Sequence, residues 1–244
     1  PYNSTCFIPA LCKKQKAYHW RIFTPANNQE IWPLQWWIIA PAFSCAGADG
    51  IVLPKVEQND QLIIANWLIH EMECRSGIEP QSLELIGLIE TGTAFINLPK
   101  IGRGFSRPVQ FGLGIGDLIS DLSLKIDSDE TTISYFRSAL VAASKAANIA
   151  PPIDSVWLNV NDDDGMTSSV KRGRSFGLIG KFVLTTHQAQ LAQEAIQPTQ
   201  VEIAEAQVMI EAYENAKAQG EAFAIINGEF IDEPIVQRYR EMLT

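Results

Sequence analysis

The chain has 244 residues, of which 46% are hydrophobic and 19% are charged, and its formal net charge is -9. This composition excludes a disordered chain and suits one large α/β domain or two small ones. The acidic balance argues against a general nucleic-acid-binding protein and against a protein that binds anionic membranes. We therefore expect neither nucleic acid nor membrane among its partners.

The cysteines and the apolar runs indicate the cellular compartment. Cys6, Cys12, Cys45 and Cys74 form no CxxC pair and match no zinc-binding spacing, so we expect reduced thiols. No apolar run approaches the roughly 18 residues of a membrane span. The N-terminus lacks the basic start and apolar core of a signal peptide. These features predict a cytoplasmic protein.

Residues 1–46 have the least regular pattern. Four of the chain's six tryptophans fall in this part, and prolines at positions 9, 25, 33 and 41 interrupt any long element. Segments 19–23 and 36–40 are candidate strands, but neither has a periodicity that would decide the matter.

From residue 47 onward, apolar runs alternate with segments of helical periodicity. The apolar runs predict strands at 50–54, 82–90, 109–114, 153–160 and 181–185. The intervening segments predict helices or helical turns at 58–77, 91–102, 117–124, 128–149, 167–176 and 186–196. Strict alternation predicts a parallel sheet, closed or doubly wound. Five regular units, with one or two more in the irregular start, favour a TIM-type (β/α)8 barrel.

The C-terminal segment 199–244 has a different character. A T-x-x-E capping box at Thr199 predicts a helix. The Asn-Gly pair at 227–228 lies between apolar runs and predicts a tight hairpin. A final helix is predicted at 234–243 because it begins with proline. We expect a barrel body at 1–198 followed by this helix–hairpin–helix extension.

A carboxylate closes each of two neighbouring apolar runs. Glu90 ends LELIGLIE, and Asp117 follows VQFGLGIG. Because ligands gather beyond the carboxyl ends of parallel strands, the two side chains form a candidate site for a hard cation. With so few protein ligands, Mg²⁺ completed by water and substrate oxygens fits better than Ca²⁺ or Zn²⁺. The alternatives are a salt bridge for either residue and a helix N-cap for Asp117.

Other charged residues stand near predicted strand ends. Lys55 and Glu57 follow the first regular strand, where barrel active sites gather, and Lys55 is our candidate for contact with the cofactor. The alternative for both is a salt bridge at the rim. Arg21 is a candidate for bidentate binding of a substrate carboxylate, or else a surface residue. Asp232 follows the predicted hairpin and either reaches over a site or lies at the surface.

Further acids and the histidines carry weaker signals. Asp121 and the acidic loop 162–164 are candidates for solvated or capping acids. His19, His70 and His187 are each isolated, and no Ser-His-Asp or Cys-His arrangement is visible.

Six segments carry a family resemblance. They are ADGIVLPKVE (48–57), LIETGTAF (88–95), FGLGIGDLISDL (111–122), IDSVWLNVNDDDGM (153–166), GLIGKFVLTTHQ (177–188) and NGEFIDEPIVQRYREML (227–243). In this order they resemble the citrate lyase beta-subunit family, the CitE-like branch of the HpcH/HpaI aldolase superfamily. The resemblance covers roughly residues 47–244.

The resemblance implies a (β/α)8 barrel with a C-terminal extension that serves a neighbouring subunit of a homo-oligomer, a trimer or hexamer. It implies Mg²⁺ held by Glu90 and Asp117. The reaction it implies is cleavage or formation of a carbon–carbon bond in a citryl-, malyl- or citramalyl-CoA type of thioester. It also implies that Asp232 is a catalytic acid acting in trans, and that Arg21 is the candidate for the family's substrate-binding arginine.

The chain departs from the family pattern in several places. Family members open with strands resembling SLLFVPG and DLEDAV, which are absent, and Arg21 lacks the asparagine of an RVN motif. Gly116 stands where an acid usually precedes the metal-binding Asp, and LTTHQ (184–188) replaces IHPSQ. A TIM barrel typically needs about 200 to 250 residues. The expected body at 1–198 is shorter than this, and its first 46 residues have no regular pattern. We therefore expect the first two βα units to be absent or replaced.

Three functions are compatible with these observations. The leading one is a Mg²⁺-dependent acyl-CoA lyase, which cleaves the carbon–carbon bond through an enolate. The second is a thioester hydrolase on the same scaffold, in which water attack follows the enolate chemistry. The third is a catalytically degenerate binding or assembly subunit, which the missing opening strands favour.

Overall fold

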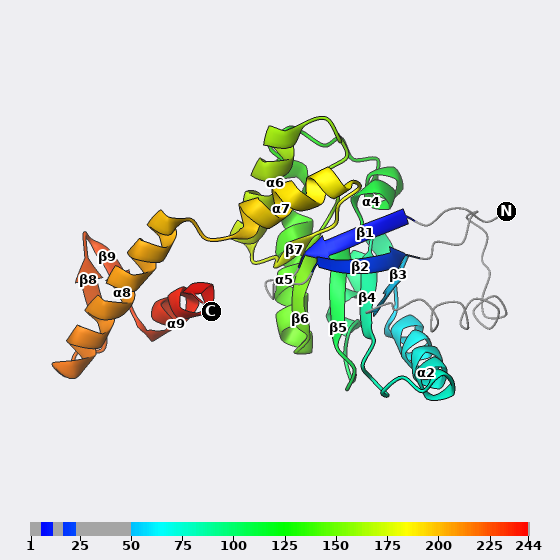
Figure 1. The fold of residues 1–244 in the computed structure, drawn as a ribbon, viewed down its shortest axis with the longest axis horizontal. Helices are drawn as coiled ribbons and strands as arrows, with labels where there is room; N and C mark the ends of the chain where they lie inside the picture. Colours follow the sequence, from blue (N-terminus) through cyan, green and yellow to red (C-terminus); the bar gives the residue numbers. More distant parts are fainter. Residues whose placement is uncertain (1–5, 12–16, 23–49, 244) are drawn as a thin grey trace. The chain divides into compact units, whose positions relative to one another are not determined.

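The computed structural model describes the backbone of residues 6–11, 17–22 and 50–243 and the side chains of residues 50–243 (Figure 1). The chain divides into two compact units, Pro1–Ile196 and Gln197–Thr244.

The first unit is built on a five-stranded parallel sheet. In spatial order its strands are β3 (Gly50–Leu53), β4 (Glu84–Ile89), β5 (Val109–Leu113), β6 (Ala150–Asp154) and β7 (Gly180–Lys181). The spatial order equals the chain order and every pairing is parallel, so all five carboxyl ends lie at one edge. The strands are apolar and largely buried, as expected for a sheet covered on both faces.

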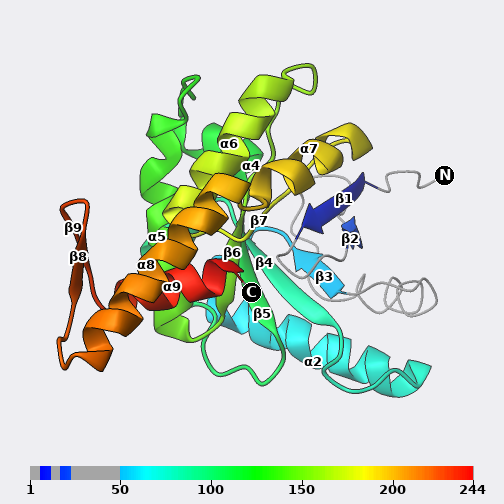
Figure 2. The ribbon, with the colours of Figure 1, turned by 60° about the vertical axis from the view of Figure 1, so that its left-hand side comes forward.

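Helices follow the strands and cover the outer side of the sheet. They are α2 (Asn59–Ser76), α3 (Gly92–Asn97), α4 (Ile115–Leu122), α5 (Ser134–Ala147), α6 (Asp163–Phe176) and α7 (Thr186–Ile196). Figures 1 and 2 show α2, α5 and α6 outside the curved sheet. The unit is an α/β fold of the TIM-barrel type, and the barrel is incomplete in the part of the chain that the structure describes. The alternation predicted from the sequence is confirmed.

Side-chain alternation divides the core into two layers. Val52, Ile86, Ile153 and Phe182 form a small cluster on the inner face of the strands. Alternate residues such as those at 51, 85 and 111 form a larger cluster with the helices on the outer face. Together the two layers hold the strand ends rigidly, so that side chains just beyond them have defined positions.

The described part of the N-terminal region forms an antiparallel hairpin. Its strands are β1 (Cys6–Leu11) and β2 (Ala17–Ile22), and no βα unit occurs there among the described residues. β1 lies against β7 and α7, while β2 lies against β3. The hairpin therefore adjoins both edges of the sheet, on the side where a complete barrel has further parallel strands. The candidate strand at 19–23 corresponds to β2, and the one at 36–40 lies outside the described residues.

Two predicted strands and two predicted helices have different limits in the structure. The helix predicted at 167–176 begins earlier, at Asp163, so Asp163 and Asp164 of the expected acidic loop lie in its first turn. The strand predicted at 153–160 corresponds to β6, which begins earlier, at Ala150, and ends at Asp154, whose side chain joins buried ion pairs. Leu158 beyond it is 57% exposed. The strand predicted at 181–185 is reduced to β7. The helix predicted at 128–149 begins as a 3-10 turn, Thr131–Ile133, and continues as α5.

The second unit consists of α8 (Gln200–Ala218), β8 (Ala224–Ile226), β9 (Glu229–Ile231) and α9 (Glu233–Leu243). The predicted capping box is present, since Thr199 and Glu202 exchange hydrogen bonds. Asn227 and Gly228 have φ angles of 51° and 86°, as expected for the central pair of a tight type I′ turn. These local predictions are confirmed.

None of the helices in the described part of the chain is long and apolar enough to cross a membrane.

Candidate metal centre

Glu90 lies at the carboxyl edge of the sheet, directly after β4. Alternation along the strand places its side chain on the inner face with Ile86, and only 4% of the residue is exposed. Its carboxylate rests above Gly114, and a Cβ atom on Gly114 would overlap it. The backbone N–H of Gly114 donates to the carbonyl of Ile89, which fixes the spacing of the two strand ends. A glycine at 114 is therefore required for this position of Glu90.

Asp117 lies in the first turn of α4, which follows β5. The helix begins at Ile115 with Gly114 as its N-cap, so Asp117 does not cap it and that alternative is wrong. A carboxylate in a first turn is favoured by the positive end of the helix dipole. Its side chain is half exposed and faces the turn after β3.

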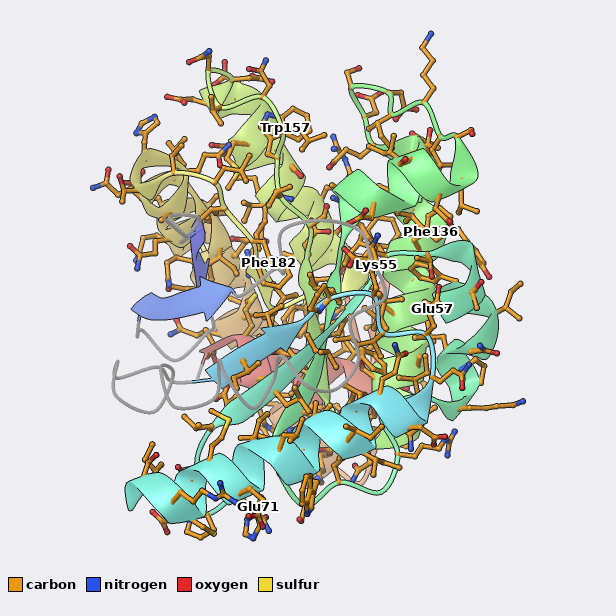
Figure 3. All side chains as sticks on the ribbon, turned by 90° about the vertical axis from the view of Figure 1, so that its right-hand side faces the viewer. Lys55, Glu57, Glu71, Phe136, Trp157 and Phe182 are labelled. Carbon is orange, nitrogen blue, oxygen red and sulfur yellow. The ribbon has the colours of Figure 1, made fainter. Side chains whose placement is uncertain are left out.

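Lys55 contacts both carboxylates. Its backbone N–H donates a hydrogen bond of 2.8 Å to Oε1 of Glu90. Its Nζ lies 3.4 Å from Oδ1 of Asp117. Figure 3 labels Lys55 together with Glu57 in the turn between β3 and α2. The structure thus brings together three of the residues selected from the sequence.

The electrostatics of the pair are those of two carboxylates in close proximity. Burial raises the pKa of Glu90 to about 7. The backbone N–H and the ammonium of Lys55 lower this pKa, while the charge of Asp117 raises it further. Two carboxylates this close, one of them buried, lack compensating positive charge, which a divalent cation would supply.

The donor set fits Mg²⁺. In the described part of the chain no group of three or more His, Cys, Asp or Glu side chains is arranged to hold a metal ion. The side chains of residues 50–243 thus form neither a zinc site nor a calcium cage by themselves. Mg²⁺ retains several waters and is commonly held by one or two carboxylates plus substrate oxygens. Glu90 and Asp117 would be its protein ligands.

The turn that carries Lys55 is held by Gln61. The amide oxygen of Gln61 accepts hydrogen bonds from the backbone N–H groups of Glu57 and Gln58, at 2.6 and 2.9 Å. Its side-chain nitrogen donates to the carbonyl of Lys55 at 3.2 Å. Glu57 itself accepts a hydrogen bond of 2.6 Å from the hydroxyl of Thr91. Glu57 therefore links two loops and is not a free site carboxylate.

The other acids at this edge have local partners. Asp121 accepts a hydrogen bond of 2.7 Å from the backbone N–H of Gly92. Asp162 is the N-cap of α6. Asp163 lies 2.8 Å from Nε2 of His187, and both side chains are exposed. These contacts bridge or cap neighbouring loops.

The two remaining candidates are Arg21 and Asp232. Arg21 is in β2, opposite Phe7 on β1, and its side chain lies outside the described residues. Asp232 belongs to the second unit, where its Oδ1 accepts a hydrogen bond of 3.2 Å from the backbone N–H of Ile235 at the start of α9. The described residues therefore leave the roles expected for Arg21 and Asp232 as predictions.

A buried ion network on the outer side of the sheet was not anticipated from the sequence. Asp154 pairs with Arg137 and Lys181, at 2.8 and 2.9 Å, and Arg137 also pairs with Glu130. The two cations beside Asp154 hold its pKa below the ordinary range, although burial opposes them. The network ties α5 to β6 and β7. No sequence signal distinguishes it, because its members lie in segments that also read as ordinary helix and strand.

Ser155 was also missed. It follows β6 directly, it is 1% exposed, and its hydroxyl has no hydrogen-bond partner among residues 50–243. Ile153 points to the inner face and Asp154 to the outer face, so alternation directs Ser155 inward. The sequence pattern does not distinguish a serine at a strand end from other serines. Only its burial without a described partner makes Ser155 a candidate residue of the site.

The parallel strands are wrapped by helices and carry two acids and a lysine at their carboxyl edge, which is where TIM-barrel proteins place their sites. The family model for HpcH/HpaI aldolase/citrate lyase matches residues 35–186. The chain belongs to this family.

One relative is similar to the chain in sequence, and one solved structure is similar to it in fold. The beta subunit of citrate lyase from Leuconostoc mesenteroides subsp. cremoris is 29% identical over 198 residues, which cover 81% of this chain and 65% of that protein. The chain thus spans slightly less than two thirds of that relative's length. A citrate lyase from Burkholderia xenovorans LB400 superposes with a TM-score of 0.72 at 18% identity, covering 86% of this chain and 68% of the other.

A second solved structure has the same fold. It is the protein CitE from Mycobacterium tuberculosis, solved in complex with magnesium, acetoacetate and coenzyme A. It superposes with a TM-score of 0.63 at 20% identity, covering 81% of this chain and 68% of the other. At this identity the likeness establishes the fold.

Proposed function

We propose that this chain is a Mg²⁺-dependent carbon–carbon lyase that acts on an acyl-CoA thioester of a hydroxy acid. The observation that carries the proposal is the pair formed by Glu90 and Asp117 at the carboxyl edge of adjacent strands, with the backbone of Lys55 bonded to Glu90. Support comes from a citrate lyase subunit among the relatives and from the magnesium and coenzyme A bound to a structural neighbour.

The proposed reaction cleaves the bond between the hydroxyl-bearing carbon and the carbon next to the thioester. The hydroxyl loses its proton, the carbon–carbon bond breaks, and its electron pair moves onto the thioester as an enolate. A proton then adds to the enolate carbon, which leaves an acyl-CoA and an oxo acid. When bound, Mg²⁺ supplies Lewis-acid stabilisation of the oxygens of the acid half.

Each candidate residue has a role in this proposal. Glu90 and Asp117 hold the metal, and Lys55 sets their positions and charge. Arg21 would bind the substrate carboxylate in a bidentate manner, which restricts its orientation. Asp232 would move the proton at a neighbouring subunit's site. Its cap bond uses Oδ1 and leaves Oδ2 for this purpose.

The proposal includes a homo-oligomer, a trimer or hexamer, in which the C-terminal extension of one subunit serves the site of another. The described extension suits such a role because apolar side chains remain exposed on its hairpin. Phe223 and Phe230 lie with ring centroids 5.1 Å apart, and Ile225 is 66% exposed. A contiguous exposed apolar surface of this kind is typical of a protein interface.

The test is substitution of the buried ligand. Glu90→Ala should abolish Mg²⁺-dependent cleavage of malyl-CoA or citryl-CoA, whereas Glu71→Ala should leave it unchanged, because Glu71 lies on α2 and pairs with Arg75. Retained activity in Glu90→Ala would refute the assignment.

Product analysis separates the other two functions. Acetyl-CoA plus an oxo acid indicates a lyase, while free CoA indicates a thioester hydrolase. Titration calorimetry that detects no Mg²⁺ binding would indicate a binding or assembly subunit.

A further inference from the structure

The backbone of Lys55 is held beside the carboxylate pair by two hydrogen bonds. Its N–H donates to the carboxylate of Glu90, and its carbonyl accepts from the side-chain amide of Gln61. Its φ angle is 51°, in the left-handed region that non-glycine residues rarely adopt. The turn therefore places the Lys55 side chain at this edge, and the N–H contact with Glu90 does not depend on the side chain.

The ammonium of Lys55 makes a weak ion pair with Asp117. The distance is 3.4 Å, and the two side chains are 49% and 50% exposed. Solvent screens such an exposed pair, and the Lys55 ammonium makes only this one contact with the Asp117 carboxylate. Among the described residues no other lysine or arginine is paired with Glu90 or Asp117.

The ion pair between Arg107 and Glu73 differs from the Lys55–Asp117 pair in both burial and geometry. There the guanidinium makes two bonds of 2.7 Å, and both side chains are fully buried. That pair is a fixed part of the fold. The Lys55–Asp117 pair is exposed and single, so a divalent cation can replace the ammonium without disturbing the core.

We propose that Lys55 is a tethered counter-cation of the metal site, whose ammonium neutralises Asp117 in the metal-free protein and is displaced when Mg²⁺ binds. This inference rests on the proposed metal site and goes beyond it, because it assigns Lys55 the role of setting metal affinity. A lysine that supported the ligands only structurally would strengthen metal binding. A displaced counter-cation weakens it.

The experiment measures Mn²⁺ affinity by electron paramagnetic resonance without substrate. Lys55→Met removes the ammonium but keeps much of the side-chain stem. Lys55→Gly removes the side chain, keeps the N–H to Glu90 and suits the left-handed backbone. Both variants should bind Mn²⁺ about three- to tenfold more tightly, as expected from removing one positive charge near a doubly charged ion. Lys55→Arg should leave the affinity close to that of the unaltered protein.

Two controls match these changes. Gln81→Gly also relieves a left-handed residue, with φ of 68°, whose N–H donates to a buried glutamate, Glu73. Lys145→Met removes a charge from the last turn of α5. Neither control should change Mn²⁺ affinity.

The outcomes separate the two proposals. If the unaltered protein binds no Mn²⁺, the metal site and the inference both fail. If it binds Mn²⁺ and the Lys55→Met and Lys55→Gly variants bind equally or more weakly, the counter-cation role is refuted while the proposed function stands. Tighter binding in both variants and in neither control supports the inference.

Discussion

Gly114 lies directly beneath the carboxylate of Glu90, and a Cβ atom at position 114 would overlap Oε2 of that carboxylate. The buried strand ends leave Glu90 little room to move away. The position of one metal-ligand candidate therefore depends on the absence of a side chain on the neighbouring strand.

This contact predicts a sharp difference between two glycines. Gly114→Ala should displace Glu90, weaken Mn²⁺ binding at least tenfold and cost about 1–3 kcal/mol of unfolding free energy through overpacking. Gly116→Ala adds a methyl group with nothing within 4 Å, and as a Gly→Ala change in a helix it should stabilise the protein by about 0.5–1 kcal/mol. Calorimetric metal titration and urea unfolding measure both quantities. Equal effects of the two substitutions on metal binding and stability would contradict the close contact between Gly114 and Glu90.

The raised pKa of Glu90 predicts a pH-dependent stability in the metal-free protein. The pKa is 4.5 in the unfolded chain and about 7 in the folded one, so between these values the folded state holds a proton that the unfolded state has lost. Stability from this group is therefore fully present below about pH 4.5 and falls as pH rises towards 7, by up to about 3 kcal/mol.

Urea unfolding between pH 4.5 and 8 in EDTA checks this expectation. Glu90→Gln cannot ionise, so it should lack this part of the pH dependence, and the difference between the two proteins isolates Glu90. Added Mg²⁺ favours the ionised carboxylate and should reduce the loss near pH 7. Parallel pH profiles for the two proteins would contradict a raised pKa.

The proposed action of Asp232 in trans predicts complementation. Glu90→Ala and Asp232→Ala should each be inactive alone, because each lacks one part of every site. After co-expression or subunit exchange, mixed oligomers contain sites with an intact Glu90 from one subunit and an intact Asp232 from another. A malyl-CoA or citryl-CoA cleavage assay should then recover a substantial fraction of activity. No recovery in verified mixed oligomers would exclude a role in trans.

The buried pair of Arg107 and Glu73 predicts a large loss of stability. Arg107→Met leaves the carboxylate of Glu73 buried without its partner and should cost about 3–5 kcal/mol. The exposed pair of Arg75 and Glu71, with 3.8 Å between its charged atoms, is the control, and Arg75→Met should change stability by less than about 0.5 kcal/mol.

Urea unfolding compares the two arginine variants. Arg107→Lys keeps the charge but loses the two-pronged geometry, so an intermediate loss is expected. It also supplies a measurement if Arg107→Met does not fold. Similar losses of unfolding free energy for the buried and the exposed pair would contradict the view that the Arg107–Glu73 pair is a fixed part of the fold.

The sequence predicted elements that depend on local interactions. The capping box at Thr199 and the Asn-Gly turn at 227–228 satisfy backbone groups within a few residues, so their spacing alone predicts them. The alternating strands and helices from residue 50 onward follow from side-chain periodicity in the same way.

The sequence failed where distant residues decide the structure. The strand ending at Asp154 was misplaced, and its carboxylate pairs with Arg137 and Lys181, two residues that are distant in the chain and that no local pattern links to it. The hairpin formed by β1 and β2 was not predicted, because its pairing joins runs that have no clear alternation of their own.

The sequence by itself determined that Glu90 and Asp117 follow apolar runs, and hence that they stand near the ends of buried parallel strands. Only the tertiary structure decided that Lys55 contacts both acids and that Gly114 makes room for Glu90. The physical reason is that these contacts lie between strands. The N–H of Lys55 and the carboxylate of Glu90 are 35 positions apart in the chain, and only the register of the sheet brings them within 2.8 Å.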